Sequence, residues 1–173
     1  MQDATFVIAV HGLVVSVANA TWSVAQWKLN GARPVLELIV GAVAANGSGL
    51  VSIPVTAGTP PNRARLAQEG FTQSVVGVTV TNMGRLPVRI QRWSIQCAAN
   101  GTAYVPLADS IGPDLPHVLE AGAQETWVVD QRRAVGLTQA AATLTGKAPE
   151  PVVATVQLGT GHTLKTKRSV HVA

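Results

Sequence analysis

Cysteine is almost absent from this chain, and Cys97 is the single example. A lone cysteine excludes an internal disulfide, and a β-rich protein without disulfides is more typical of a reducing compartment than of a secreted protein. Cys97 alternates with Trp93 and Ile95, so its thiol is predicted to share their apolar face. We therefore expect a buried, unreactive thiol at this position.

Charged and aromatic residues are also scarce, at 13% and 4% of the 173 residues. The formal net charge is only +4, and the high isoelectric point reflects few acidic residues rather than a dense basic surface. Nucleic-acid binding needs clustered Lys and Arg against the phosphates, and single strands also need aromatic platforms on which bases stack. Basic residues are scattered until the C-terminus and aromatic residues are dispersed, so a nucleic-acid partner is not expected.

Signatures of catalysis and of metal binding are missing. Histidines stand at positions 11, 117, 162 and 171, and no two of them have metal-ligand spacing. His117 lies near Asp114 in a predicted loop, which leaves open a weak cation site or, more simply, a solvated loop. The stretch from Gly159 to Gly161 joins two predicted strands and is interpreted as a hairpin turn rather than a phosphate loop. We therefore predict no enzyme activity, no cofactor, and no catalytic or metal-binding residues.

What the sequence does contain is β-strand alternation, most clearly in residues 75–95. Val76, Val78 and Val80 alternate with Gly and Thr, and this period of two is typical of a half-buried strand. The segment from Asn82 to Arg85 then predicts a turn, because Asn and Gly tolerate positive φ. The rest of the chain is expected to be organised around this antiparallel hairpin.

In the second strand of the hairpin, the apolar residues shift from even-numbered to odd-numbered positions. Apolar residues stand at even positions up to Ile90 and at odd positions from Trp93 onward. A β-bulge near Gln91 or Arg92 would explain the change. Arg89 and Arg92 would then lie on the outer face, either as a basic patch or as the solvated side of an ordinary strand.

A short helix is predicted within the later strands. Asp130 can cap a helix over residues 131–144, which Gly146 and Pro149 would end. The residues expected to face the core are Val135, Leu137, Ala141 and Leu144. Other predicted strands are 34–43, 50–55, 104–107, 125–129, 152–158 and 163–172, with polar loops at 57–70 and 108–117.

These elements predict a mainly β protein. About eight strands with regular turn signals indicate an antiparallel immunoglobulin-like β-sandwich with one inserted short helix. Trp93 and Trp127 each stand in an alternating apolar run and are predicted to be core residues. The Cys–Trp–Cys spacing of true immunoglobulin domains is absent, so the expected likeness is one of architecture.

An N-terminal hydrophobic α-helix is predicted before the sandwich. Residues 6–27 carry no formal charge and have the length of a membrane span, and Trp22, Trp27 and Lys28 resemble an interfacial anchor. We divide the chain into residues 1–32, the helix with a short link, and residues 33–173, the β-sandwich domain. If the helix spans a membrane, Lys28 and Arg33 place the sandwich in the cytoplasm by the positive-inside rule.

Polar and small residues form one narrow stripe along this helix. Gly12, Ser16, Asn19, Ser23 and Gln26 fall close together at about 100° per residue, and the remaining circumference is largely apolar. Two interpretations stay open. The stripe either associates helices in a membrane, with homo-oligomers as one result, or packs against neighbouring subunits of a larger assembly.

A possible basic surface is formed near the C-terminus by Lys147, Lys165, Lys167 and Arg168. One interpretation is binding to an anionic surface, which salt would weaken. The other is protection of a sheet edge, because alternating lysines on an exposed strand block edge-to-edge pairing.

Several segments together resemble small uncharacterised proteins of actinobacteria and their phages. The segments are the hydrophobic N-terminus ending in Trp and a cation, RPVLELIV, VTVTNMGRLPVRIQRW, LPHVLEAGAQETW and VQLGTGHTLKTKRSV, and the best motif is Asn82 to Val88. The resemblance implies no activity. We therefore predict a non-catalytic interaction module, held at a membrane by its helix and with an unknown protein partner, or alternatively a structural component of an assembly such as a phage virion.

Overall fold

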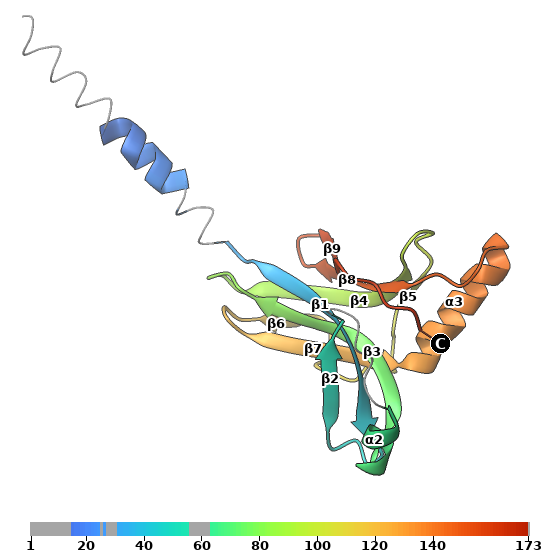
Figure 1. Ribbon diagram of the computed structural model, residues 1–173. Coiled ribbons are helices and arrows are strands. Elements are labelled where there is room, and N and C mark those ends of the chain that lie inside the picture. Colours follow the sequence, from blue (N-terminus) through green and yellow to red (C-terminus); the bar gives the residue numbers. More distant parts are fainter. Residues whose placement is uncertain (1–14, 25, 27–30, 56–62, 173) are drawn as a thin grey trace, which may run out of the picture.

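The computed structural model describes residues 15–24, 26, 31–55 and 63–172, and within them two antiparallel β-sheets face each other (Figure 1). The first sheet has the order β2-β1-β3-β7, and the second has the order β5-β4-β8-β9 with β6 also paired to β4. The strands are β1 (Pro34–Ala44), β2 (Leu50–Pro54), β3 (Phe71–Asn82), β4 (Val88–Cys97), β5 (Ala103–Tyr104), β6 (His117–Leu119), β7 (Gln124–Asp130), β8 (Val152–Leu158) and β9 (Thr163–Lys165). The prediction of a mainly β protein is confirmed.

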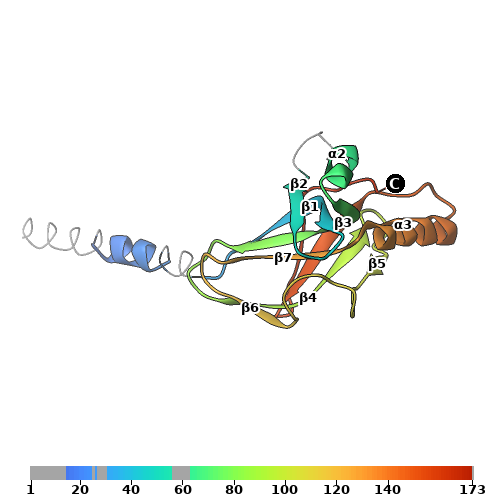
Figure 2. The ribbon, with the colours of Figure 1, turned by 90° about the horizontal axis from the view of Figure 1, so that it is seen from below.

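The core lies between the two sheets and is built by the alternation seen in the sequence. Val76, Val78 and Val80 of β3 are fully buried and belong to one hydrophobic cluster with residues of both sheets. Trp93 and Trp127 are 1% and 0% exposed, so both predicted core tryptophans are confirmed. Figure 2 shows the sandwich from below, with α3 (Gln131–Thr145) at the end opposite the N-terminal segment.

The change of parity in β4 is produced by the bulge that the sequence predicted. Pairing with β8 shifts between Ile90 and Arg92, and both Gln91 and Arg92 are exposed. The extra residue turns Trp93 inward, where it pairs opposite Val156. Arg92 consequently stays on the outer face of the sheet.

The thiol of Cys97, the last residue of β4, is buried as predicted. Burial raises the pKa of Cys97, and the negative charge of Glu150 raises it further. A thiol of this kind is a poor nucleophile because little of it is ionised.

The predicted polar loop at 57–70 is partly wrong, because α2 (Arg63–Gln68) forms in it. Arg, Ala, Leu and Gln are strong helix formers, a signal that the preceding Pro-Pro pair obscured. The helix packs against β3 and half-buries Leu66.

A second small hydrophobic cluster, separate from the main core, joins Ile39, Val43, Val75 and Val128 in the first sheet.

The helix predicted after Asp130 is confirmed as α3, and its predicted core-facing residues are confirmed in part, since Ala141 is buried and Leu137 is half-buried against the core. Asp130 caps it by accepting from Arg132 N–H, and Gly146 ends it in the left-handed conformation. The buried residues are Ala134, Thr138 and Ala141, whereas Leu144 is 79% exposed. Small side chains at this spacing let the helix lie close to β3, β4, β5 and β7 at the end of the sandwich, which the apolar pattern alone could not indicate.

The N-terminal helix is present at residues 15–24, and every side chain in that stretch is exposed. Figure 1 draws it, in blue, away from the sandwich. At about 1.5 Å per residue such a stretch is roughly half as long as the ~30 Å hydrocarbon core of a bilayer. In the described part of the chain no helix is long and apolar enough to cross a membrane, so the predicted membrane location is corrected. Residues 6–14, 25 and 27 of the predicted span, and Lys28 after it, lie outside the described residues.

Candidate functional site

The N-terminal segment joins the sandwich at a buried polar junction centred on Asn82. Its Oδ1 accepts from the backbone N–H of Arg33 at 3.2 Å and of Gly84 at 3.0 Å. Its Nδ2 donates to the backbone oxygens of Leu86 at 2.8 Å, and of Leu119 and Glu120 at 3.2 Å each. Asn82 is fully buried, so one side chain ties the segment before β1 to two turns of the sandwich.

Gly84 allows the chain to approach this junction closely. A Cβ at this position would lie 2.2 Å from the carbonyl oxygen of Gly31 and 2.5 Å from the amide nitrogen of Arg33. The turn predicted here is present, but Gly84 does not adopt the positive φ on which the prediction rested. The glycine is required because the backbone of residues 31–33 runs directly against the turn.

The predicted stripe lies on an exposed helix. Ser16, Asn19, Ser23 and Gln26 are all exposed, while Gly12 lies outside the described residues. Large apolar residues occupy other sides of the same helix and are also exposed: Val15 59%, Val17 58%, Trp22 64% and Val24 62%. The helix therefore presents apolar surface on more than one side and is not packed on the sandwich.

The predicted basic surface is distributed over different elements. Lys147 follows α3, Lys165 ends β9, and Lys167 and Arg168 stand in the loop after it; all four are exposed. The Lys165 Nζ donates to the backbone oxygen of Ala98 at 3.2 Å. The short β9 is the edge strand of the second sheet, which is the setting that the edge-protection interpretation requires.

The structure places two further cations on the same outer face as Lys165. Arg92 lies opposite Gln157 in β8, and Lys165 lies opposite Thr155, the next outward residue of β8. Arg89 lies one outward position before the bulge in β4 and packs its side chain over Gly159. Sequence reasoning missed this grouping because β4 and β9 are far apart in the chain, although the lack of Asp and Glu in β4, β8 and β9 was a readable signal.

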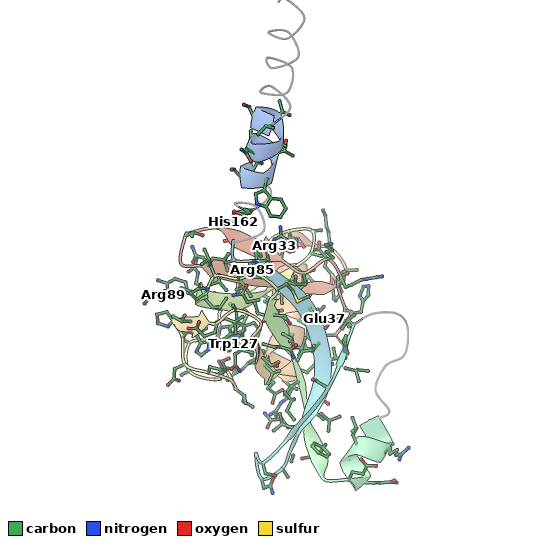
Figure 3. The ribbon with its side chains drawn as sticks, turned by 90° about the vertical axis from the view of Figure 1, so that its left-hand side faces the viewer. Arg33, Glu37, Arg85, Arg89, Trp127 and His162 are labelled. Atoms are coloured by element: carbon green, nitrogen blue, oxygen red, sulfur yellow. The ribbon has the colours of Figure 1, made fainter. Side chains whose placement is uncertain are left out.

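More positive charge lies at the end of the sandwich from which the N-terminal segment leaves. Figure 3 shows Arg33 and Arg85 on this side, below the helix. Arg85 is in the turn that contacts residues 31–33, since its N–H donates to the Gly31 oxygen at 3.3 Å. Arginines therefore lie both at the junction and on the outer face of the second sheet.

A polar groove lies at the opposite end, beside the start of α3. Two adjoining hollows of about 570 and 490 Å³ share Gln73, Asp130 and Arg132 in their walls. Hydrogen bonding from Arg132 lowers the pKa of Asp130, which also caps the helix. The Asp109 carboxylate accepts from Tyr104, and burial together with this contact raises the pKa of Tyr104.

Both carboxylates of the groove are engaged in ion pairs. Arg132 pairs with Asp130, and the Arg133 Nε lies 3.0 Å from Asp109 Oδ2. For Asp130, hydrogen bonding from Arg132 stabilises the charged form, and such a carboxylate is a poor proton donor near neutral pH. The groove is therefore explained by stabilisation of the α3 start, and its contacts do not form a catalytic arrangement.

Other polar clusters were compared with the requirements of a metal site. Over the described residues, no group of three or more His, Cys, Asp and Glu side chains is arranged to hold a metal ion. His117, singled out with Asp114 in the sequence, instead contacts Trp127 edge-on at a centroid distance of 6.0 Å.

Comparison of the chain with protein-family models and with curated proteins gave no match.

Proposed function

We propose that this protein is a non-catalytic assembly module whose N-terminal helix packs against neighbouring protein subunits, a second copy of the chain being the first to test. The observation that carries the proposal is the complete exposure of residues 15–24, including Trp22 and three valines. An isolated helix of this length is marginal in water, and most helical stability in proteins comes from packing an apolar face. A partner that covers the valines and Trp22 would supply that packing.

The attachment of the helix supports this proposal. Asn82 and Gly84 hold residues 31–33 rigidly against the sandwich, so the segment leading into the helix starts from a defined position. A module of this form offers an anchored point of attachment from which the N-terminal segment leaves the sandwich. An assembly such as a phage virion, which the sequence resemblance suggested, would use a component of this kind.

We also propose that the sandwich is immunoglobulin-like. The strand β3 pairs with β1 and β7, while β4 pairs with β8, and β8 with β9. This matches the pairing of strand B with A and E, and of C with F and F with G, in that fold. The buried Trp93 stands on the strand equivalent to C, where the fold has its hallmark tryptophan. The strand β2 and the helix α3 are then additions to that pairing pattern.

The test of the assembly proposal is the mass of the full chain in solution, measured by light scattering over a dilution series. Val17 and Val24 lie on the side opposite the polar stripe, so Val17→Lys with Val24→Lys should dissociate the oligomer into monomers. Asn19→Lys with Ser23→Lys tests the stripe with the same added charge. A parent chain that stays monomeric at every concentration, both alone and with the other proteins of its source, contradicts the proposal.

A further inference from the structure

The outer face of the second sheet is a polar surface with positive charge and no acidic residue of its own. Its cations are Arg89, Arg92 and Lys165, and we call these three with the polar residues between them the cationic face. Cross-strand pairing sets the rows Arg92–Gln157–Thr163 and Ser94–Thr155–Lys165 side by side. The strands β4, β8 and β9 contain no Asp or Glu.

The charge of this face is not neutralised within the described part of the chain. The ion pairs there are Arg65–Glu69, Arg132–Asp130 and Arg133–Asp109, none of which involves the cationic face. Arg89 and Arg92 make no ion pair with a described carboxylate, although the chain has acidic residues on β1, β7 and the connecting turns. Positive charge without an internal partner is available to a partner from outside.

One carboxylate lies near an end of the face. Glu150 Oε2 accepts from the backbone N–H of Ala99 at 3.1 Å and of Asn100 at 3.2 Å, in the turn whose Ala98 oxygen accepts from Lys165. Its negative charge reduces the attraction of Lys165 for anions. Arg89 and Arg92, farther along the sheet, are therefore the stronger part of the face.

We infer that the cationic face docks an acidic protein surface, in a contact separate from that of the N-terminal helix. Arginine binds carboxylates through two parallel hydrogen bonds, and the half-buried Gln157 with the exposed Thr163, in the same row as Arg92, adds further polar groups. The outward positions of these strands carry no aromatic side chain on which a nucleic-acid base could stack. The flat, mixed polar surface therefore fits protein carboxylates better than single-stranded nucleic acid.

The test measures binding of a fluorescein-labelled oligoglutamate peptide to the full chain by fluorescence anisotropy. The variant Arg89→Gln, Arg92→Gln, Lys165→Gln removes the three cations of the face. The matched control, Arg65→Gln, Arg132→Gln, Arg133→Gln, removes the three ion-paired arginines. Each variant lowers the net charge from +4 by three, to +1, so overall charge is equal in both. Unchanged circular dichroism spectra show that both variants fold.

We expect the face variant to weaken peptide binding about tenfold and to flatten its salt dependence, and the control to change affinity less than about twofold. Equal weakening in both variants would show that only net charge matters, and no weakening in either would remove the face from binding; both results overturn the inference. A single-stranded oligonucleotide of equal charge that binds tighter than the peptide through these same residues would also overturn it, in favour of a nucleic-acid partner. Because these variants leave residues 15–24 intact, the result is independent of the assembly test.

Discussion

The sandwich and the N-terminal helix use the same residue types in opposite ways. Trp93 and Trp127 are buried between two sheets that cover each other, while Trp22 is 64% exposed on a helix that nothing in the described chain covers. The sandwich satisfies its own apolar and polar groups, and no buried side-chain polar atom in the described residues lacks a hydrogen-bond partner. The helix satisfies its backbone but leaves its apolar side chains in water.

This difference shows that the sandwich covers its own apolar side chains, whereas the described N-terminal helix does not. A contiguous patch of exposed apolar side chains is typical of an interaction site. The junction at Asn82 lies between the sandwich and the exposed helix. It belongs to the sandwich, because Asn82 is buried and hydrogen-bonded to the backbone of Arg33 and Gly84. Four predictions, each with its own variants, test this comparison.

Truncation of the core tryptophans should have the largest effect. Trp93→Ala or Trp127→Ala removes a large buried side chain and its hydrogen bond, to Ser110 Oγ or to the Pro113 oxygen. We expect a loss of about 3 to 5 kcal/mol in the free energy of unfolding, measured by denaturant titration. Trp22→Ala is the control and should change stability by less than about 0.5 kcal/mol. An equal loss in the control would show that Trp22 is packed as a core residue.

Substitution of Asn82 should have the next largest effect. Asn82→Ala leaves the backbone groups that its side chain satisfied without partners in a buried place, which we expect to cost about 2 to 4 kcal/mol in unfolding free energy. Asn82→Asp keeps the acceptor for Arg33 and Gly84 but loses the donor to Leu86. If thermal and chemical unfolding of both variants matched the parent, the junction would be open to water.

A methyl group at Gly84 tests the close approach at the same junction. Gly84→Ala places its Cβ against backbone atoms of residues 31–33, and we expect a loss of about 1 to 3 kcal/mol. Gly136→Ala is the matched control, since that position is inside α3 with nothing within 4 Å. The control should gain about 0.5 to 1 kcal/mol from helix propensity. We therefore expect the free energy of unfolding to fall in Gly84→Ala and to rise in Gly136→Ala, both measured by denaturant titration.

The smallest effect concerns how the folding stability provided by Asp130, at the start of α3, changes in acid. Hydrogen bonding from Arg132 holds the pKa of Asp130 below its ordinary value, so the native state favours the charged form. This contribution is complete above the unfolded pKa near 4 and disappears as the pH falls through the lower folded value. Asp130→Asn keeps a capping oxygen but not the charge, and should lose about 0.5 to 1 kcal/mol at pH 7. As the pH falls from 7 through the folded pKa of Asp130, the difference between the variant and the parent should shrink, and a difference that does not shrink in acid would contradict the assignment.

Alternation of residue types was sufficient to predict much of the sandwich. Period two in β3, the parity change in β4 and the capping pattern of α3 each depend on residues adjacent in sequence, and each was confirmed. The core-facing residues of α3 were predicted correctly for Ala141 and Leu137 but wrongly for Leu144, which is exposed at the end of the helix. The cluster of Arg89, Arg92 and Lys165 was not predicted, since its members come from strands that only sheet pairing brings together.

The sequence by itself therefore determined the longer strands, the bulge in β4, the core tryptophans and the hydrophobic N-terminal helix, because each is encoded in the local spacing of apolar and polar side chains. The short β6 was not predicted, and the predicted strands 104–107 and 163–172 are shorter in the structure, where β5 is Ala103–Tyr104 and β9 is Thr163–Lys165. Only the tertiary structure decided that Asn82 joins residues 31–33 to two turns, that Gly84 is needed for a backbone contact, and that one face of the second sheet carries uncompensated positive charge. These features depend on contacts between residues distant in the chain, and local periodicity contains no information about which distant residues will meet.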